Sequence, residues 1–288
     1  MRLVWLNRNP STHPGGDLIM LRALKEAMVQ RGHRCHELYG EWTSRDLLPF
    51  DLVLIYHVNF PWSFENITKT QLAGKPYVLL PIFYPTDQLG MTYRSMREAM
   101  EEAACVCPLS FTEAREISDY TGFRGPFSVI PHGTEERFHW DRGDQDCCVA
   151  TSCARGGKGE DLVEKVCGKL GLPCKHFINI PHEELHLHYR KARVFVHSSP
   201  DDRMSLTVGE ALCSGCRVLS SVYDRGNEWF PGLKVLNPKN EQELESYIRM
   251  AWESEKWDWR PNERAREMTW GKTAKAWEKV CERALCSN

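Results

Sequence analysis

Short apolar runs alternate with longer amphipathic segments through the first half of the chain. Apolar runs bounded by turn residues are typical of buried strands, and apolar positions three and four residues apart are typical of helices. The runs predict strands over 3–7, 35–38, 51–56, 76–81, 105–107 and 127–130. The amphipathic segments predict helices over 17–31, 91–104 and 111–121.

The same alternation returns after a polar, aperiodic stretch from His139 to Asp146, which we interpret as a linker. Strands are predicted over 146–151, 175–179, 192–197, 217–221 and 234–236, and helices over 160–170, 182–191, 205–214, 241–257 and 273–285. Such alternation favours parallel sheets with right-handed crossovers. The sequence therefore predicts an α/β protein with two Rossmann-like domains, 1–142 and 143–270, whose sheets face each other across a ligand-binding cleft.

Size and charge narrow the class of protein. The chain has 288 residues and a formal net charge of −2. A general nucleic-acid-binding protein usually carries a basic excess, so the near-neutral charge argues against one. No apolar run approaches the ~20 residues that span a bilayer, and the start of the chain is typical of a strand rather than a signal peptide. We expect a cytoplasmic enzyme without an integral membrane segment.

Metal-binding patterns are weak in this sequence. Its twelve cysteines are scattered, which favours reduced thiols in a reducing compartment. One segment, His182-Glu-Glu-Leu-His186, matches the metalloprotease pattern HExxH. Its third zinc ligand would have to come from elsewhere in the chain. We interpret the segment as a polar helix face and expect no metal site.

The stretch from 198 to 215 has the clearest chemical pattern. It follows the predicted strand 192–197 and opens a helix, whose first N–H groups have no partner within the helix and attract anions such as a diphosphate. These N–H groups belong to Ser205, Leu206 and Thr207. Asp202 and Glu210 flank the segment and can bind sugar or ribose hydroxyls. The pattern predicts the donor site of an enzyme that uses sugar nucleotides.

A glycine-rich turn ahead of the predicted helix 160–170 carries two cations, Arg155 and Lys158. Flanking glycines let a backbone approach a ligand closely. Lys158 can then neutralise the charge that builds on a diphosphate leaving group, with Arg155 beside it. The simpler alternative for each is a solvated turn residue.

Taken in order along the chain, these segments resemble the motifs of GT-B glycosyltransferases, in particular of glycosyltransferase family 4. The resemblance covers nearly the whole chain. It rests on Gly15-Gly16, Arg31-Gly32-His33, Cys107-Pro-Leu-Ser110, Val129-Ile-Pro-His-Gly133, Gly157-Lys-Gly159 with Asp161, the 182–196 helix and strand, the acids Asp202 and Glu210 in the place of an E-x7-E motif, and Gly226-Asn-Glu228. It implies a C-terminal helix, 271–288, that crosses back to the first domain.

The resemblance also implies a reaction and roles for residues. The enzyme would move a hexose or pentose from a UDP- or GDP-sugar to an acceptor hydroxyl, with retention at the anomeric carbon and without a bound metal or other cofactor. Lys158 and Arg155 would contact the diphosphate, Glu210 the ribose, and Asp202 the donor sugar. Gly16 would let the first-domain loop approach the phosphates or the acceptor. His132 and His57 end strands that face the proposed cleft, where each either contacts the sugar or acceptor or is a structural histidine.

Three departures from the family pattern leave alternatives open. Asp202 is one methylene shorter than the usual glutamate, Cys153 stands where a basic residue is usual, and Pro131-His-Gly133 replaces Pro-Asn-Gly. The acceptor is open between a glycan, a lipid-linked acceptor, a small molecule and a modified base in DNA. The remaining alternative is a catalytically inactive GT-B subunit that only binds. Trp62, Tyr84 and Asp87 follow strand ends where they could line the acceptor side.

Overall fold

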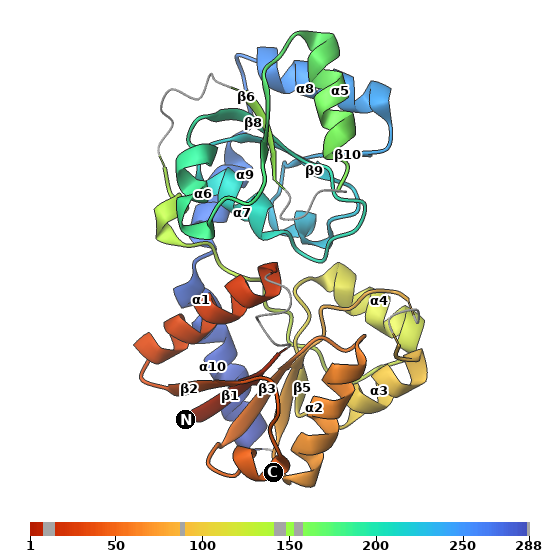
Figure 1. Ribbon diagram of the computed structural model, residues 1–288, viewed down its shortest axis with the longest axis vertical. Coiled ribbons are helices and arrows are strands. Elements are labelled where there is room, and N and C mark those ends of the chain that lie inside the picture. The colour runs from red at the N-terminus through yellow and green to blue at the C-terminus, as the bar shows by residue number, and fades with distance from the viewer. Residues whose placement is uncertain (8–14, 87–89, 141–147, 153–157, 287–288) are drawn as a thin grey trace. The chain divides into compact units, whose positions relative to one another are not determined.

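The computed structural model describes residues 1–7, 15–86, 90–140, 148–152 and 158–286 (Figure 1). The chain divides into two compact units, of which the first comprises Met1–His132 with Trp270–Asn288 and the second Gly133–Thr269. Each unit contains one parallel five-stranded sheet within the described residues. No helix in these ranges is both long and apolar enough to cross a bilayer.

The first unit forms around the apolar runs of the first half. Its strands are β1 (Arg2–Leu6), β2 (Arg34–Leu38), β3 (Leu52–Tyr56), β4 (Tyr77–Leu80) and β5 (Cys105–Val106), in the order β2-β1-β3-β4-β5. The strand β3 is buried along its whole length, as expected for a central strand of a parallel sheet. The helices are α1 (Gly16–Gln30), α2 (Pro61–Leu72), α3 (Tyr93–Glu101), α4 (Phe111–Thr121) and α10 (Trp270–Cys286), with a 3₁₀ turn η1 (Ser44–Leu47).

The last helix belongs to the first unit, although 137 residues of the second unit, Gly133–Thr269, precede it in sequence. α10 packs against α1 (Figure 1). Glu278 of α10 accepts hydrogen bonds from Arg31 and lies 2.8 Å from the His33 ring nitrogen at the end of α1. The prediction that the C-terminal helix returns to the first domain is confirmed.

The second unit repeats the same connectivity. Its strands are β6 (Cys148–Ser152), β7 (Cys174–Phe177), β8 (Ala192–His197), β9 (Arg217–Ser221) and β10 (Lys234–Leu236), in the order β10-β9-β8-β6-β7. Its helices are α5 (Glu160–Leu170), α6 (His182–Tyr189), α7 (Leu206–Cys213), α8 (Glu241–Glu253) and α9 (Arg260–Glu267), with 3₁₀ turns η2 (Glu136–Phe138) and η3 (Arg225–Trp229).

The strand order determines where each unit can bind a ligand. In both sheets the second strand lies on one side of the first, and the third, fourth and fifth strands lie on the other side. The connection reverses between β1 and β3 in the first unit and between β6 and β8 in the second. Open parallel sheets bind ligands beyond the carboxyl ends of their strands at such a switch point. The loops after β6 and β8 are therefore the expected place for a site in the second unit.

Several predicted elements differ from the structure. The segment 127–130 forms a single parallel bridge, Val106 to Phe127, instead of a strand, because Pro108 ends β5 after two residues. The sequence reading omitted α2 and α9, although a proline stands in the first turn of each, as is common at helix starts. Most of the proposed linker, 141–146, lies outside the described residues.

Candidate functional site

The loops after β6 and β8 pack directly against each other. Gly159 has φ +90°, and a Cβ there would lie 2.7 Å from the Ser198 carbonyl oxygen. The Lys158 N–H donates to Glu160 Oε2 at 2.6 Å, which fixes the loop where it enters α5. The backbone of this turn is therefore held against the end of β8, and only glycine fits at position 159.

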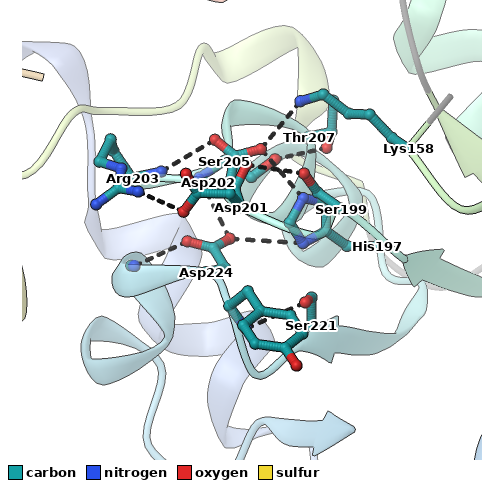
Figure 2. Close-up of polar contacts among 12 residues, drawn as sticks. Lys158, His197, Ser199, Asp201, Asp202, Arg203, Ser205, Thr207, Ser221 and Asp224 are labelled. Atoms are coloured by element: carbon teal, nitrogen blue, oxygen red, sulfur yellow. Dashed lines mark hydrogen bonds and ion pairs between the residues drawn. The ribbon is translucent and has the colours of Figure 1, made fainter. Parts of the chain in front are cut away.

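This packing brings together two residues that the sequence placed in the donor site. Lys158 Nζ lies 3.1 Å from Asp202 Oδ2 (Figure 2). The lysine side chain is 48% exposed and the aspartate side chain 20% exposed. The pair therefore lies at the surface of the switch point, where an incoming anion can compete with Asp202 for the ammonium group.

A histidine and a second aspartate extend this pair into the interior. His197 is the last residue of β8, and its Nε2 lies 3.3 Å from Asp202 Oδ2, while its Nδ1 lies 3.7 Å from Asp224 Oδ2 (Figure 2). The Asp224 carboxylate accepts hydrogen bonds from the N–H of Ser205, at 3.3 Å, and of Gly226, at 2.8 Å. The sequence interpretation missed both residues. The signal for them was their position after neighbouring parallel strands.

The two carboxyl groups on His197 have opposite pKa shifts. Burial raises the pKa of Asp224 above its usual value, and the neighbouring Asp202 carboxylate also raises it, against the effect of His197. Burial acts in the same direction on Asp202, but the hydrogen bond from His197 and the charge of Lys158 outweigh it and lower the pKa of Asp202. Asp202 therefore keeps its negative charge to lower pH than Asp224 does. Unequal carboxyl groups that share one partner are a common feature of functional sites.

Three more charged residues support the loop behind Asp202. Arg203 is buried and donates to the Asp201 carboxylate, to which Arg225 also donates at 2.9 Å. From sequence alone, Arg203 is open between a surface position and a contact with phosphate or acceptor. Its burial and its bond to Asp201 assign it to the support of the loop.

α7 begins directly beside this cluster. The helix opens at Leu206 after Ser205. The Ser205 side chain makes no capping hydrogen bond within the described chain, and its hydroxyl lies 2.8 Å from the Thr207 hydroxyl instead. Of the three N–H groups that the sequence predicted to be unpaired, that of Ser205 already donates to the Asp224 carboxylate, so the prediction is wrong for Ser205 and the remaining candidates are those of Leu206 and Thr207 in the first turn of α7. An N-terminus of this kind attracts anions.

Glu210 lies about one turn further along α7, where it is buried and contacts His182 of α6. Its Oε1 is 2.6 Å from His182 Nε2, and its Oε2 is buried without a hydrogen-bond partner in the described part of the chain. His182 also lies near Glu135 and Arg137. Burial lowers the pKa of His182, but the hydrogen bond and charge of Glu210, together with Glu135, raise it above its usual value.

The HExxH segment thus has a different use from that of a zinc protease. His182 binds Glu210, and the His186 ring packs edge-on against Phe138 at 6.2 Å. Within the ranges that the structure describes, no group of three or more His, Cys, Asp or Glu residues is arranged to hold a metal ion.

The other predicted site residues belong to the first unit or lie outside the described chain. Gly16 is the first residue of α1. His132 is buried and stacks on Trp270 at 6.1 Å. His57 follows β3 with φ +66° and lies 3.4 Å from Asp17 at the start of α1, so it occupies the switch point of the first sheet. Arg155, Cys153 and Asp87 are outside the described residues.

Comparison with known proteins found similar structures but no matching sequence family. No protein-family model matches the sequence, and no curated protein does. Among solved structures, sucrose-phosphate synthase from Thermosynechococcus elongatus matches with a TM-score of 0.82 at 14% identity, over 100% of both chains. A glycosyltransferase from Rickettsia africae matches with a TM-score of 0.77 at 10% identity, over 100% of this chain and 99% of its own. The chain has the GT-B fold.

Another GT-B structure was solved with a sugar nucleotide. Anabaena Alr3699/HepE in complex with UDP-glucose matches with a TM-score of 0.77 at 12% identity, over 98% of this chain and all of its own. The predicted architecture of two Rossmann-like sheets is confirmed. The match covers both chains almost completely, so both sheets of the GT-B fold are present within these 288 residues.

Proposed function

We propose that this protein is a retaining glycosyltransferase that moves a sugar from a UDP- or GDP-sugar to an acceptor hydroxyl. The observation that carries this proposal is the contact of Lys158 with Asp202 at the β6/β8 switch point, beside the N-terminus of α7. The fold supports it, since a relative of the same fold was solved with UDP-glucose. In this proposal the second unit binds the donor, and the first unit, with Gly16, His132 and His57, serves the acceptor.

The proposed diphosphate site works by electrostatics alone. Lys158 would leave Asp202 and pair with the diphosphate, whose oxygens would also accept hydrogen bonds from the N–H groups of Leu206 and Thr207. Preorganised donors of this kind stabilise charge that develops on a leaving group and need no metal ion. Arg155, in the same glycine-rich turn, would add a second cation.

The nucleotide and the sugar would be held by the two acids. Glu210 has one carboxylate oxygen on His182 and a second that is buried and has no hydrogen-bond partner among the described residues. This second oxygen would accept a hydrogen bond from a ribose hydroxyl. Asp202 would turn to the donor sugar once the diphosphate has taken Lys158. His182 is then a positioning residue, because it fixes the rotamer of Glu210.

The proposed reaction follows from the family resemblance. The bond between the anomeric carbon and the diphosphate oxygen breaks, and the acceptor oxygen forms its bond to that carbon on the same face. The acceptor proton goes to the departing phosphate oxygen. The protein therefore needs no carboxylate pair spaced for glycoside hydrolysis.

The test begins with a thermal-shift panel of nucleotides and sugar nucleotides, because a ligand of the native state raises its apparent stability. Each stabilising sugar nucleotide is then incubated with glycan, lipid-linked, small-molecule and duplex-DNA acceptors, and the release of nucleoside diphosphate is measured. NMR of the product gives its anomeric configuration. Lys158→Ala and Glu210→Ala should abolish the release. Binding of the nucleotide without turnover on any acceptor would indicate an inactive binding subunit. Failure to bind any nucleotide would contradict the proposal.

A further inference from the structure

The first unit contains a second group of reactive side chains that the donor site does not use. Cys105 and Cys107 lie on and just after β5, the edge strand of the sheet. Residues two apart on a strand project from the same face, and their Sγ atoms are 3.8 Å apart. Cys105 is half-buried and Cys107 is buried. Two thiols are thus held almost in contact, one of them open to solvent.

Two further side chains approach Cys105 from outside the strand. The Ser128 N–H donates to the Val106 carbonyl at 3.0 Å, which holds residue 128 beside the strand. Ser128 Oγ lies 3.2 Å from Cys105 Sγ, and the Arg283 guanidinium of α10 donates to the same Oγ at 3.1 Å. A hydroxyl therefore contacts this thiol, and a cation contacts the same hydroxyl.

A cavity of about 580 Å³ adjoins this cluster, between α10 and the segment 128–130. Ser128 and Arg283 are both in its wall. Lys279 and Glu282 also line it, and its remaining surface includes Val129 and Val280. The cavity presents two cations and one carboxylate, which favours a small anionic molecule. It is large enough for a tripeptide-sized group.

The surroundings shift the pKa values of the two thiols in opposite directions. The hydrogen bond from Cys107 lowers the pKa of Cys105, as do Ser128 and the charge of Arg283, and against the effect of burial the value falls to about 6. Burial raises the pKa of Cys107. Cys105 is accordingly a thiolate near neutral pH, and the thiolate is the form of cysteine that reacts.

We propose that Cys105 is a nucleophilic modification site that takes small anionic disulfides such as glutathione disulfide, with Cys107 as the resolving thiol. The Cys105 sulfur attacks one sulfur of the incoming disulfide, whose S–S bond breaks as the mixed disulfide forms. The expelled thiolate takes up a proton. Cys107 then loses its proton and attacks the Cys105 sulfur, which releases the second thiol and leaves a Cys105–Cys107 disulfide. The incoming disulfide is the oxidant and gains two electrons.

Alkylation tests the nucleophile directly. A limiting dose of iodoacetamide at pH 6.5, followed by peptide mapping, should label Cys105 about fivefold faster than an unactivated thiol, after allowance for the lower intrinsic nucleophilicity of a low-pKa thiolate. N-acetylcysteine, added to the same sample, is the reference thiol, because Cys286, the exposed thiol at the end of the same helix, lies in the wall of the same cavity. Arg283→Met should slow the labelling of Cys105 at pH 6.5. Arg94→Met, which removes an exposed arginine of α3 paired with Glu98, should not.

Glutathione disulfide then tests the pair. The wild type should yield an internal Cys105–Cys107 disulfide, whereas Cys107→Ala should stop at one glutathionyl group on Cys105. Cys105→Ala should yield neither product, and circular dichroism establishes that each variant is folded. Labelling of Cys105 no faster than N-acetylcysteine, or the same product from the wild type and Cys107→Ala, would overturn the proposal. Neither experiment depends on sugar-nucleotide binding, so its outcome is independent of the proposed function.

Discussion

His182 Nε2 lies 2.6 Å from Glu210 Oε1, and both side chains are largely buried. This contact joins the first turn of α6 to the middle of α7. It determines which way Glu210 points, and the family resemblance implies that Glu210 binds the ribose. The pair thus connects the fold of the second unit with its proposed nucleotide site.

The His182–Glu210 pair predicts a pH dependence of stability. The folded-state pKa of His182 is raised above its unfolded value, so the stabilisation is fully present below the unfolded pKa of about 6.5. It is lost as the pH rises through the folded pKa. His182→Gln should remove this pH dependence and cost about 1.5–3 kcal/mol below pH 6.5, the range for a hydrogen bond to a charged group.

Urea unfolding between pH 5.5 and 8.5 measures this effect. His36→Gln, on β2 of the first unit, is the matched control and should leave the difference between low and high pH as in the wild type. If His182→Gln retained the wild-type pH profile, the pair would not be an ionic interaction.

The conformation and packing of Gly159 predict that a methyl group at this position destabilises the fold. Gly159→Ala should destabilise the second unit by about 1–3 kcal/mol, because its φ of +90° is unfavourable for alanine and the Cβ would collide with the Ser198 carbonyl. Gly168→Ala is the matched control, since a Cβ there meets nothing within 4 Å. It lies within α5, where alanine is favoured over glycine by about 0.5–1 kcal/mol. Thermal unfolding of the two variants should therefore shift in opposite directions, and equal shifts would contradict the packing of the two loops.

Replacement of Asp202 should lower turnover without lowering nucleotide affinity. Asp202→Asn removes the charge that holds Lys158, so a nucleoside diphosphate should bind at least as tightly as to the wild type. Turnover should fall by tenfold or more, on the order of one lost contact in the transition state. Initial-rate kinetics and a binding titration measure the two quantities. A parallel loss of both would indicate that Asp202 serves only to hold the loop.

Much of the fold could be predicted from the sequence because central strands such as β3 and β4 are uninterrupted apolar runs. The predictions for α4, α5, β8, β9 and β10 agree with the structure at both ends. The helix α9 was missed since its sequence is highly polar and only Pro261, Asn262 and Ala265 are buried. The position of such a helix is decided by tertiary packing, which local periodicity does not contain.

The site was predictable only as far as it follows contiguous motifs. Lys158 and Asp202 each stand in a recognisable loop, and the structure brings them into contact. The role of His197 and Asp224 depends on β8 and β9 being neighbours in register, which no local pattern states. The same holds for His182, which matched a metal motif in sequence and binds Glu210 in the structure.

Isothermal titration calorimetry of UDP and GDP tests most directly whether Lys158 and the start of α7 hold a diphosphate. One of the two nucleotides should bind the wild type, and Lys158→Met should weaken its binding by about tenfold or more, the effect of one charged hydrogen bond. The same variant should leave the affinity for the nucleoside without phosphates unchanged. Lys165→Met, which removes an exposed α5 lysine paired with Glu241, should leave both affinities unchanged. Equal nucleotide affinity in Lys158→Met and the wild type would contradict the central claim.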